Sequence, residues 1–403
     1  HNMKKKCISF ILLAFIITTS VLVLPGSKIN AADDINITSE GSGSIKVIQD
    51  TSAKPDALNN ALLDKLKEEQ NVYGCINILG DSISEGYAVD YEDEYVTLLF
   101  KKIFELLGVE DTETDINMPD VGTEYFKYGG DYSYGFSGPI RKSLILKPNA
   151  TITFTGDFKY VDVWYKRTPD SGSIEIYKNN VLQKTLDLSG EEGIVTTYPS
   201  QTIERGEGVY TIKCVGAPVE ILGVIRLNSE PGSTIYCNRM ALSATATSDY
   251  IYEPILESIY TIGSLNNSKK NLFIIALGTN DMFNKQKASP VAMYVENMRT
   301  IAKYLMDRGQ DVILYWPPTA DPEIYEPRYG FYGTYKEALY GLAEELNVPV
   351  IDVSVSNPTS GESYYDGLHP NAYGHKLYYQ DFLDVILKQV PQLKYAKIRR
   401  LIM

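Results

Sequence analysis

Three short segments of the 403-residue chain place polar side chains capable of chemistry at predicted strand ends or in a late loop. They are Gly80–Ser82, which opens "GDSIS", Leu277–Asp281, which reads "LGTND", and Asp366–Asn371, which reads "DGLHPN". Taken alone, each segment also suits an ordinary turn or helix cap, because Gly, Asp, Asn and Ser are common there. Together they supply a hydroxyl, an amide, a carboxylate and an imidazole, which are groups that nucleophilic catalysis uses.

The histidine count restricts the choice of a base for a serine nucleophile. The chain has three histidines, and His1 would leave with the N-terminal segment. Asp366 precedes His369 by three residues across a glycine, a spacing that lets a carboxylate orient one ring nitrogen while the other faces a nucleophile. The alternative is a polar loop capped by Asn371. His375 falls in a predicted helix among tyrosines, where we expect a packing or surface role.

Alternation of apolar strands and amphipathic helices must position these groups. Strands are predicted at 75–79, 233–242, 271–277, 311–316 and 348–354, and helices at 56–70, 92–107, 249–263, 290–309, 333–347 and 371–388. This order predicts a parallel sheet covered by helices on both faces. In such sheets the working residues lie at the carboxyl ends of the strands.

Between residues 117 and 230 the sequence shows no convincing helical period. Short alternating runs, separated by turn residues, occur at 150–156, 161–166, 173–180, 209–216 and 219–227. They predict an all-β sandwich, jelly-roll-like, inserted into the α/β domain beside the mouth of its site. The predicted organisation is a signal peptide over 1–31, a linker over 32–55, the α/β domain over 56–116 and 231–395, and the insertion over 117–230.

The N-terminal residues indicate an exported protein, and the overall charge argues against two classes of partner. Lys4–Lys6 precede an apolar run over 8–24, and Ile29–Ala31 ("INA") resembles a cleavage site. An uncleaved membrane anchor is the alternative, since the run approaches spanning length. A net charge of −13 argues against nucleic acid and against anionic lipid as partners of the mature chain.

Cysteines and acidic residues predict neither a disulfide scaffold nor a cofactor. Cys75 falls in an apolar run and fits a core position, while a Cys214–Cys237 bridge is left open because spacing alone cannot establish one. Asp111–Asp115 ("DTETD") has the carboxylate spacing of a calcium loop but lacks its glycine and terminal glutamate. We therefore expect a solvated charge cluster there, and no metal or cofactor.

The three reactive segments, in their order, resemble the SGNH (GDSL-type) hydrolase family over residues 57–115 and 232–395. This resemblance implies a three-layer α/β/α domain. It also implies that Ser82 is the nucleophile, His369 its base and Asp366 the residue that orients the base. The Asn280 amide and the Ser82 backbone N–H would belong to the oxyanion hole. A third donor, a glycine N–H in the family, falls on Ala244 within "ALSATATSD", where an alanine adopts positive φ with difficulty.

The predicted insertion narrows the implied function. An SGNH domain interrupted by a β-sandwich is similar in arrangement to peptidoglycan O-acetylesterases. The resemblance thus implies a secreted acetylesterase whose partner is an acetylated polysaccharide or peptidoglycan-type substrate. The alternatives are an esterase for lipid or small acyl esters, disfavoured by the lack of an apolar loop near the reactive segments, and a non-catalytic glycan-binding surface protein. Trp164, Tyr160 and Tyr165 would stack on sugar or fill a core.

Overall fold

The computed structural model describes ten stretches of the chain. They are 73–107, 126–139, 142–198, 200, 202–227, 235–264, 270–317, 320–322, 324–356 and 362–390. The chain divides into two compact units, residues 1–63 and 64–403, and every described residue lies in the second. The predicted signal peptide, the linker, the helix at 56–70 and the acidic cluster at 111–115 lie outside the described residues. None of the helices described is long and apolar enough to cross a membrane.

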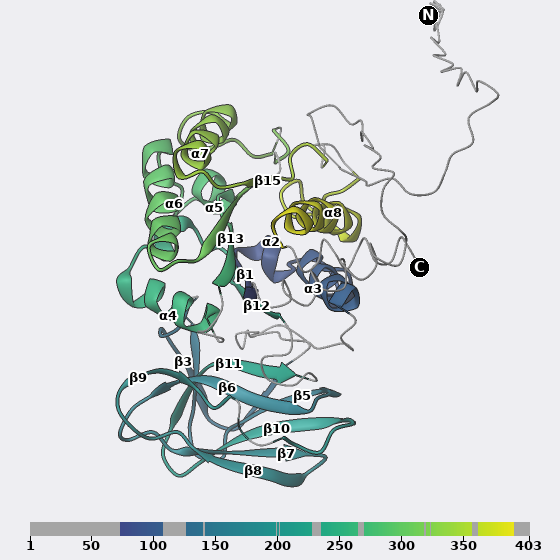
Figure 1. Cartoon of the computed structure of the whole chain (residues 1–403), viewed down its shortest axis with the longest axis vertical. Coiled ribbons are helices and arrows are strands. Elements are labelled where there is room, and N and C mark those ends of the chain that lie inside the picture. The colour runs from purple at the N-terminus through teal and green to yellow at the C-terminus, as the bar shows by residue number, and fades with distance from the viewer. Residues whose placement is uncertain are drawn as a thin grey trace, which may run out of the picture. The chain divides into compact units, whose positions relative to one another are not determined.

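A five-stranded parallel sheet forms the centre of the α/β part (Figure 1). Its strands, in spatial order, are β12 (Tyr236–Ala241), β1 (Tyr73–Gly80), β13 (Lys270–Ala276), β14 (Asp311–Trp316) and β15 (Val350–Asp352). All four neighbouring pairs are parallel, so the five carboxyl ends share one edge of the sheet. The prediction of a parallel sheet is confirmed, with each predicted strand matched within a few residues.

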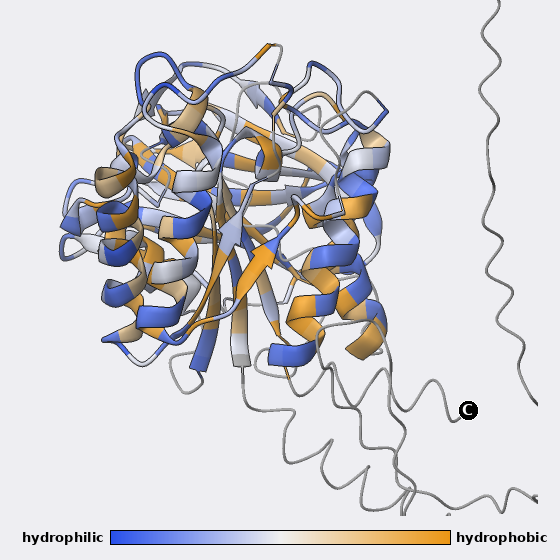
Figure 2. Ribbon diagram, turned by 90° about the horizontal axis from the view of Figure 1, so that it is seen from above, coloured by the Kyte–Doolittle hydropathy of each residue, from blue (hydrophilic) through white to orange (hydrophobic). Residues whose placement is uncertain are grey.

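Helices cover both faces of this sheet, which makes the three layers visible in Figure 2. They are α2 (Ser82–Glu85), α3 (Tyr95–Leu107), α4 (Glu253–Gly263), α5 (Thr279–Phe283), α6 (Val291–Met306), α7 (Tyr332–Leu346) and α8 (Ala372–Gln389), with short 3₁₀ turns at Tyr91–Asp93 and Thr247–Asp249. Successive side chains of β1 point to opposite faces of the sheet. Ile76 and Ile78 join the core beneath α3 and α8, and Leu79 joins the core beneath α4, α6 and α7.

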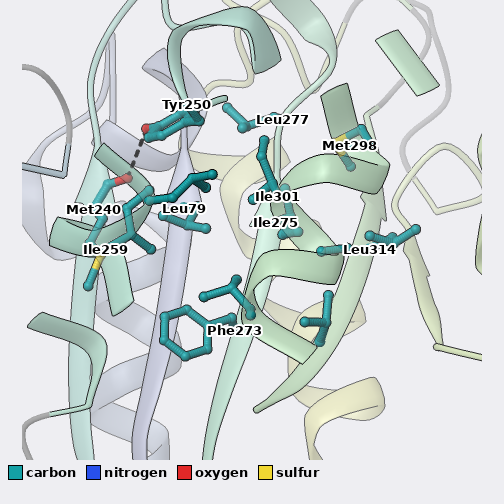
Figure 3. Close-up of a cluster of buried hydrophobic side chains, with 14 of the residues drawn as sticks. Leu79, Met240, Tyr250, Ile259, Phe273, Ile275, Leu277, Met298, Ile301 and Leu314 are labelled. Atoms are coloured by element: carbon teal, nitrogen blue, oxygen red, sulfur yellow. Dashed lines mark hydrogen bonds between the residues drawn. The ribbon is translucent and has the colours of Figure 1, made fainter. Parts of the chain in front are cut away.

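The core beneath α4 and α6 is drawn in Figure 3. Leu79, Phe273 and Ile275 come from the sheet and pack against Ile259 and other apolar side chains of the covering helices. A polar residue also lies on this face. Asn77 is fully buried, and its amide donates to the carbonyls of Gly263 and Leu272, both at 3.1 Å. The hydrogen bonds offset the cost of burying its amide.

Two further five-stranded sheets, both antiparallel, are built from the chain between α3 and β12. The first runs β2 (Lys127–Gly129), β5 (Thr151–Asp157), β10 (Glu207–Val215), β7 (Ser173–Lys178) and β8 (Val181–Asp187). The second runs β3 (Tyr132–Gly135), β4 (Ser143–Leu146), β11 (Val219–Leu227), β6 (Tyr160–Arg167) and β9 (Gly193–Thr196). One apolar cluster draws on both sheets, with Ile152 and Ile212 from the first and Val163 and Ile221 from the second.

The antiparallel strands contact the parallel sheet near the start of its edge strand. Tyr160 and Trp164 are 5% and 3% exposed and belong to the same cluster as Met240, so they fill a core and are not available to stack on sugar. The Tyr198 hydroxyl lies 2.7 Å from that of Tyr236, the first residue of β12. This contact is at the amino end of β12, whereas we expected these strands beside the carboxyl-end site.

Two of the cysteines discussed above lie in separate cores. Cys214 packs in the cluster shared by the antiparallel sheets, and its thiol donates to the carbonyl of Ala217 at 3.3 Å. Cys237 lies in the cluster beneath α3 and α8. The thiol of Cys214 is free, so the bridge to Cys237 that the sequence left open is not formed.

Candidate active site

Ser82 begins helix α2 immediately beyond the carboxyl end of β1. The turn requires Gly80, because a Cβ at that position would lie 2.2 Å from Ser84 Oγ. Asp81 caps the helix, its carboxylate accepting from the Ile83 N–H at 3.0 Å, and burial raises its pKa to about 7. Gly86 ends the helix at φ +95°. Ser82 therefore sits on a short, closely packed turn at the edge where the strands end, with 6% of its surface exposed.

His369 and Asp366 form one side of the site, in the loop before α8. His369 Nδ1 lies 2.8 Å from Asp366 Oδ2, while Asp366 Oδ1 accepts from the backbone N–H groups of Leu368 at 3.0 Å and His369 at 2.8 Å. Gly367 adopts φ +81°, a left-handed conformation that favours glycine and lets the loop turn back on itself. The carboxylate is thus fixed by three donors before any substrate is present.

The two segments meet at a single hydrogen bond. Ser82 Oγ lies 2.9 Å from His369 Nε2, which completes a line from hydroxyl to imidazole to carboxylate. Burial alone would raise the pKa of Asp366, but the hydrogen bonds from His369 and Leu368 hold it below its ordinary value, so the carboxylate is charged at neutral pH. A charged acceptor at Nδ1 favours the tautomer in which Nε2 accepts the serine proton.

The predicted oxyanion residues Asn280 and Ala244 are brought together in a second group. The Asn280 amide donates to the carbonyl of Thr245 at 2.9 Å. A turn closed by the Thr245 N–H and the Leu242 carbonyl, at 3.3 Å, carries Ala244 at φ +61°. The alanine therefore does adopt the left-handed conformation, at a cost of about 1–2 kcal/mol.

Two carboxylates that the sequence analysis did not single out hold this second group. Glu85, at the end of α2, accepts from the Ser243 backbone N–H at 2.6 Å and from its hydroxyl, directly before Ala244. Asp281 is fully buried and accepts from the Thr247 N–H at 3.0 Å, and burial raises its pKa to about 6. A usable signal for Glu85 was its position three residues after Ser82, on the same short helix.

The other polar side chains near the reactive segments serve packing. Ser84 is buried, and its hydroxyl lies 2.6 Å from the Tyr95 hydroxyl. His375 is fully buried as well, and its Nδ1 accepts from the Tyr95 N–H at 3.1 Å. The packing role expected for His375 agrees with this environment. The ring of Tyr87, by contrast, lies 4.5 Å from the ring of His369 and is 49% exposed.

Comparison with protein-family models finds one match. Residues 227–377 match the GDSL-like Lipase/Acylhydrolase family, a stretch that includes Ala244, Asn280, Asp366 and His369. Ser82 lies outside the matched residues. Along the chain, the strands β2 to β11 separate β1 and α2 from β12 and the later strands of the parallel sheet. No curated protein matches the chain.

Among solved structures, a peptidoglycan O-acetylesterase aligns with a TM-score of 0.58 and 12% identity, covering 82% of this chain and 95% of its own. A family two carbohydrate esterase from Clostridium thermocellum gives a TM-score of 0.31 at 12% identity, covering 66% and 99%. At these identities a structural likeness shows the fold, and only the first TM-score is high enough to do so. The chain thus has an SGNH hydrolase fold, and over residues 227–377 it resembles the GDSL-like lipase/acylhydrolase family.

Proposed function

We propose that this chain is an exported serine esterase that removes O-acetyl groups from a carbohydrate or cell-wall glycan. The observation that carries the proposal is the line of hydrogen bonds from Ser82 Oγ through His369 to Asp366, at 2.9 and 2.8 Å. These are the relations between nucleophile, base and orienting carboxylate that acyl transfer to a serine requires.

The reaction begins when Ser82 Oγ attacks the ester carbonyl and passes its proton to His369 Nε2. The imidazolium is stabilised by the Asp366 carboxylate at Nδ1. His369 then returns the proton to the leaving alcohol oxygen, which departs and leaves an acetyl group on Ser82. Water, deprotonated by His369, attacks this acyl-enzyme, and acetate is released with Ser82 protonated again.

The negative charge on the carbonyl oxygen would meet three donors. The Ser82 N–H is the first of helix α2 and so has no partner within the helix. The other two donors are the second N–H of the Asn280 amide and the backbone N–H of Ala244. They belong to one turn, because the Asn280 amide donates to the carbonyl of Thr245, the residue after Ala244. Removing one such donor costs about 2.7–4 kcal/mol of transition-state stabilisation.

The domain organisation is part of the same proposal. The ten strands from β2 to β11 form a β-sandwich inserted between α3 and β12, which fits their shared core. Residues 1–31 are a signal peptide, 32–55 a linker, and 56–116 with 231–395 the hydrolase domain. Export would place the enzyme where acetylated wall glycans occur, and the similar fold of a peptidoglycan O-acetylesterase supports that substrate class.

One observation favours a second candidate, an esterase for longer acyl or lipid esters. We expected no apolar loop near the reactive segments, yet Ile324 is 62% exposed, and its Cδ1 would lie 3.1 Å from a Cβ at Gly367. Apolar surface therefore borders the loop that carries Asp366 and His369. Such surface suits an acyl chain as well as the apolar face of a sugar ring.

A single set of rates tests both candidates. Wild type, Ser82→Ala and Ser84→Ala are compared on ethyl acetate, on ethyl octanoate and on an acetylated oligosaccharide. We expect acetyl esters to be cleaved much faster than octanoyl esters, and Ser82→Ala to be inactive with unchanged thermal unfolding. An inactive Ser84→Ala beside an active Ser82→Ala would show that the nucleophile is misassigned. A preference for octanoate would favour the second candidate, and an inactive wild type would favour the non-catalytic alternative.

A further inference from the structure

The proposed site has one side that faces the leaving alcohol of the ester and another that faces its carbonyl oxygen. His369 Nε2 must lie within hydrogen-bonding distance of the leaving oxygen when that oxygen takes up its proton. Side chains packed on the His369 ring therefore border the alcohol part of the ester. Those around Asn280 and Ala244 border the carbonyl oxygen instead. The residues on the His369 side then decide which alcohols the enzyme accepts.

Tyr87 is the aromatic residue that packs on the His369 ring. Its ring centroid lies 4.5 Å from that of His369, with the planes tilted by 48°. Almost half of its surface, 49%, is exposed, although it lies two residues after helix α2, whose first three residues are buried. One part of the ring thus supports the base, and the remaining part presents a flat apolar surface with a hydroxyl at its rim.

Asp321 and Tyr325 form a second wall, and a backbone hydrogen bond joins Asp321 to the loop that carries His369. The Asp321 N–H donates to the carbonyl of Gly367 at 2.8 Å, and the Tyr325 N–H donates to the carbonyl of Asp321 at 2.7 Å. A Cβ at Gly367 would lie 3.7 Å from Tyr325 Cε2. The Tyr325 ring also packs edge-on against Phe283 of α5, with centroids 6.2 Å apart. Burial raises the pKa of the Tyr325 hydroxyl, so it stays a donor at neutral pH.

We propose that Tyr87 and Tyr325 form a subsite for the alcohol part of the substrate, and that this alcohol is an uncharged sugar ring. The inference rests on the proposed function. Tyr87 offers a face for the apolar side of the ring, and the two hydroxyls offer partners for its hydroxyl groups. The carboxylates of Glu85 and Asp366, and a net charge of −13, disfavour the phosphate of a phospholipid at the same place.

Two esters with the same acyl group and different alcohols test the subsite. Initial rates on an acetylated xylo-oligosaccharide and on ethyl acetate are measured for wild type, Tyr87→Ala, Tyr87→Phe and the control Tyr134→Ala. Tyr134 is 39% exposed and lies on β3. Because Tyr87 also packs on His369, its loss can lower both rates, but we expect Tyr87→Ala to lower kcat/KM on the oligosaccharide about tenfold more than on ethyl acetate, with the extra loss mainly in KM. Tyr87→Phe keeps the ring face and loses the hydroxyl, so on the oligosaccharide it should fall between wild type and Tyr87→Ala, and Tyr134→Ala should stay close to wild type on both esters.

Binding without turnover gives an independent measurement. The acetylated oligosaccharide is titrated into Ser82→Ala and into Ser82→Ala with Tyr87→Ala, and we expect the second to bind about tenfold more weakly. Equal losses of activity on both esters would mean that Tyr87 only orients His369, and would overturn the subsite. Wild type that hydrolyses ethyl acetate but does not bind the oligosaccharide would also overturn it while leaving the esterase chemistry intact. Wild type inactive on every ester would overturn the proposed function itself.

Discussion

Replacing Asp366 by asparagine tests the site through the tautomer of His369. The Asp366 carboxylate accepts from two backbone N–H groups at Oδ1 and from Nδ1 of His369 at Oδ2. An asparagine has one acceptor oxygen and one donor nitrogen. With the oxygen kept on the two backbone donors, the amide nitrogen faces Nδ1. Nδ1 must then accept, and the ring proton moves to Nε2, where it blocks transfer from Ser82.

The size of the effect follows from the loss of the base. The same substitution in a chymotrypsin-type triad lowers kcat about 10⁴-fold by fixing the wrong tautomer. At about 1.36 kcal/mol for each factor of ten, this corresponds to about 5 kcal/mol in the activation free energy. Asp366→Asn should cost little stability, within about 1 kcal/mol, because both backbone hydrogen bonds are retained and one hydrogen bond to His369 is reversed in direction.

The assay is hydrolysis of ethyl acetate at pH 7 by wild type, Asp366→Asn and Asp352→Asn, with urea unfolding of each. Asp352 is a matched control. Its carboxylate also accepts from a backbone N–H, that of Ser354 at 2.9 Å, and it is the last residue of β15 in the parallel sheet. We expect the loss only in Asp366→Asn. Activity of Asp366→Asn within about tenfold of wild type, or an equal loss in Asp352→Asn, would refute the reasoning.

Three further changes should separate packing from catalysis. Ser84→Ala leaves the buried Tyr95 hydroxyl without its 2.6 Å partner, so it should lower the unfolding free energy by about 1–3 kcal/mol in urea titrations while ester hydrolysis is kept. Glu85→Ala should lower kcat about tenfold with KM unchanged, because the turn after Ser243 loses its anchor; an unchanged kcat would exclude this role. Burial lowers the pKa of His375 from 6.5 to about 3. Between these pH values the unfolded chain binds a proton at His375 that the folded chain does not bind, so lowering the pH destabilises the fold. From pH 7 to pH 5 this contributes about 2 kcal/mol of lost stability, which should be absent in His375→Gln when unfolding is measured at both values.

The α/β part could be predicted from the sequence because its pattern is strong and local. Strand β1 reads as an apolar run that stops at Gly80, and α6 and α8 carry long helical periods. The order of three reactive segments then supplied the site, since parallel strands bring their carboxyl ends to one edge. The structure places Ser82, His369 and Asp366 in one line, although they are separated by up to 287 residues.

What the sequence did not supply depends on single side-chain contacts. Glu85 was given no role from the sequence, and the hydrogen bond that it accepts from the Ser243 N–H shows that it holds the turn. For Ala244 the residue type argued against a positive φ, yet the turn adopts φ +61°. The bonds from Glu85 to Ser243 and from Asn280 to Thr245, on either side of the alanine, fix the backbone there and offset its conformational cost.

The contact of the antiparallel strands changes which parts of the chain can meet a substrate. The Tyr198 hydroxyl contacts that of Tyr236 at the start of β12, and Ala241 at the end of β12 pairs with Gly80, two residues before Ser82. Five residues of strand at roughly 3.3 Å each separate these levels by about 16 Å. The contact of Tyr198 is therefore made well below the level of Ser82. This geometry agrees with the proposed subsite, in which recognition comes from the loops at the carboxyl edge, where Tyr87 and Tyr325 lie beside the loop of His369.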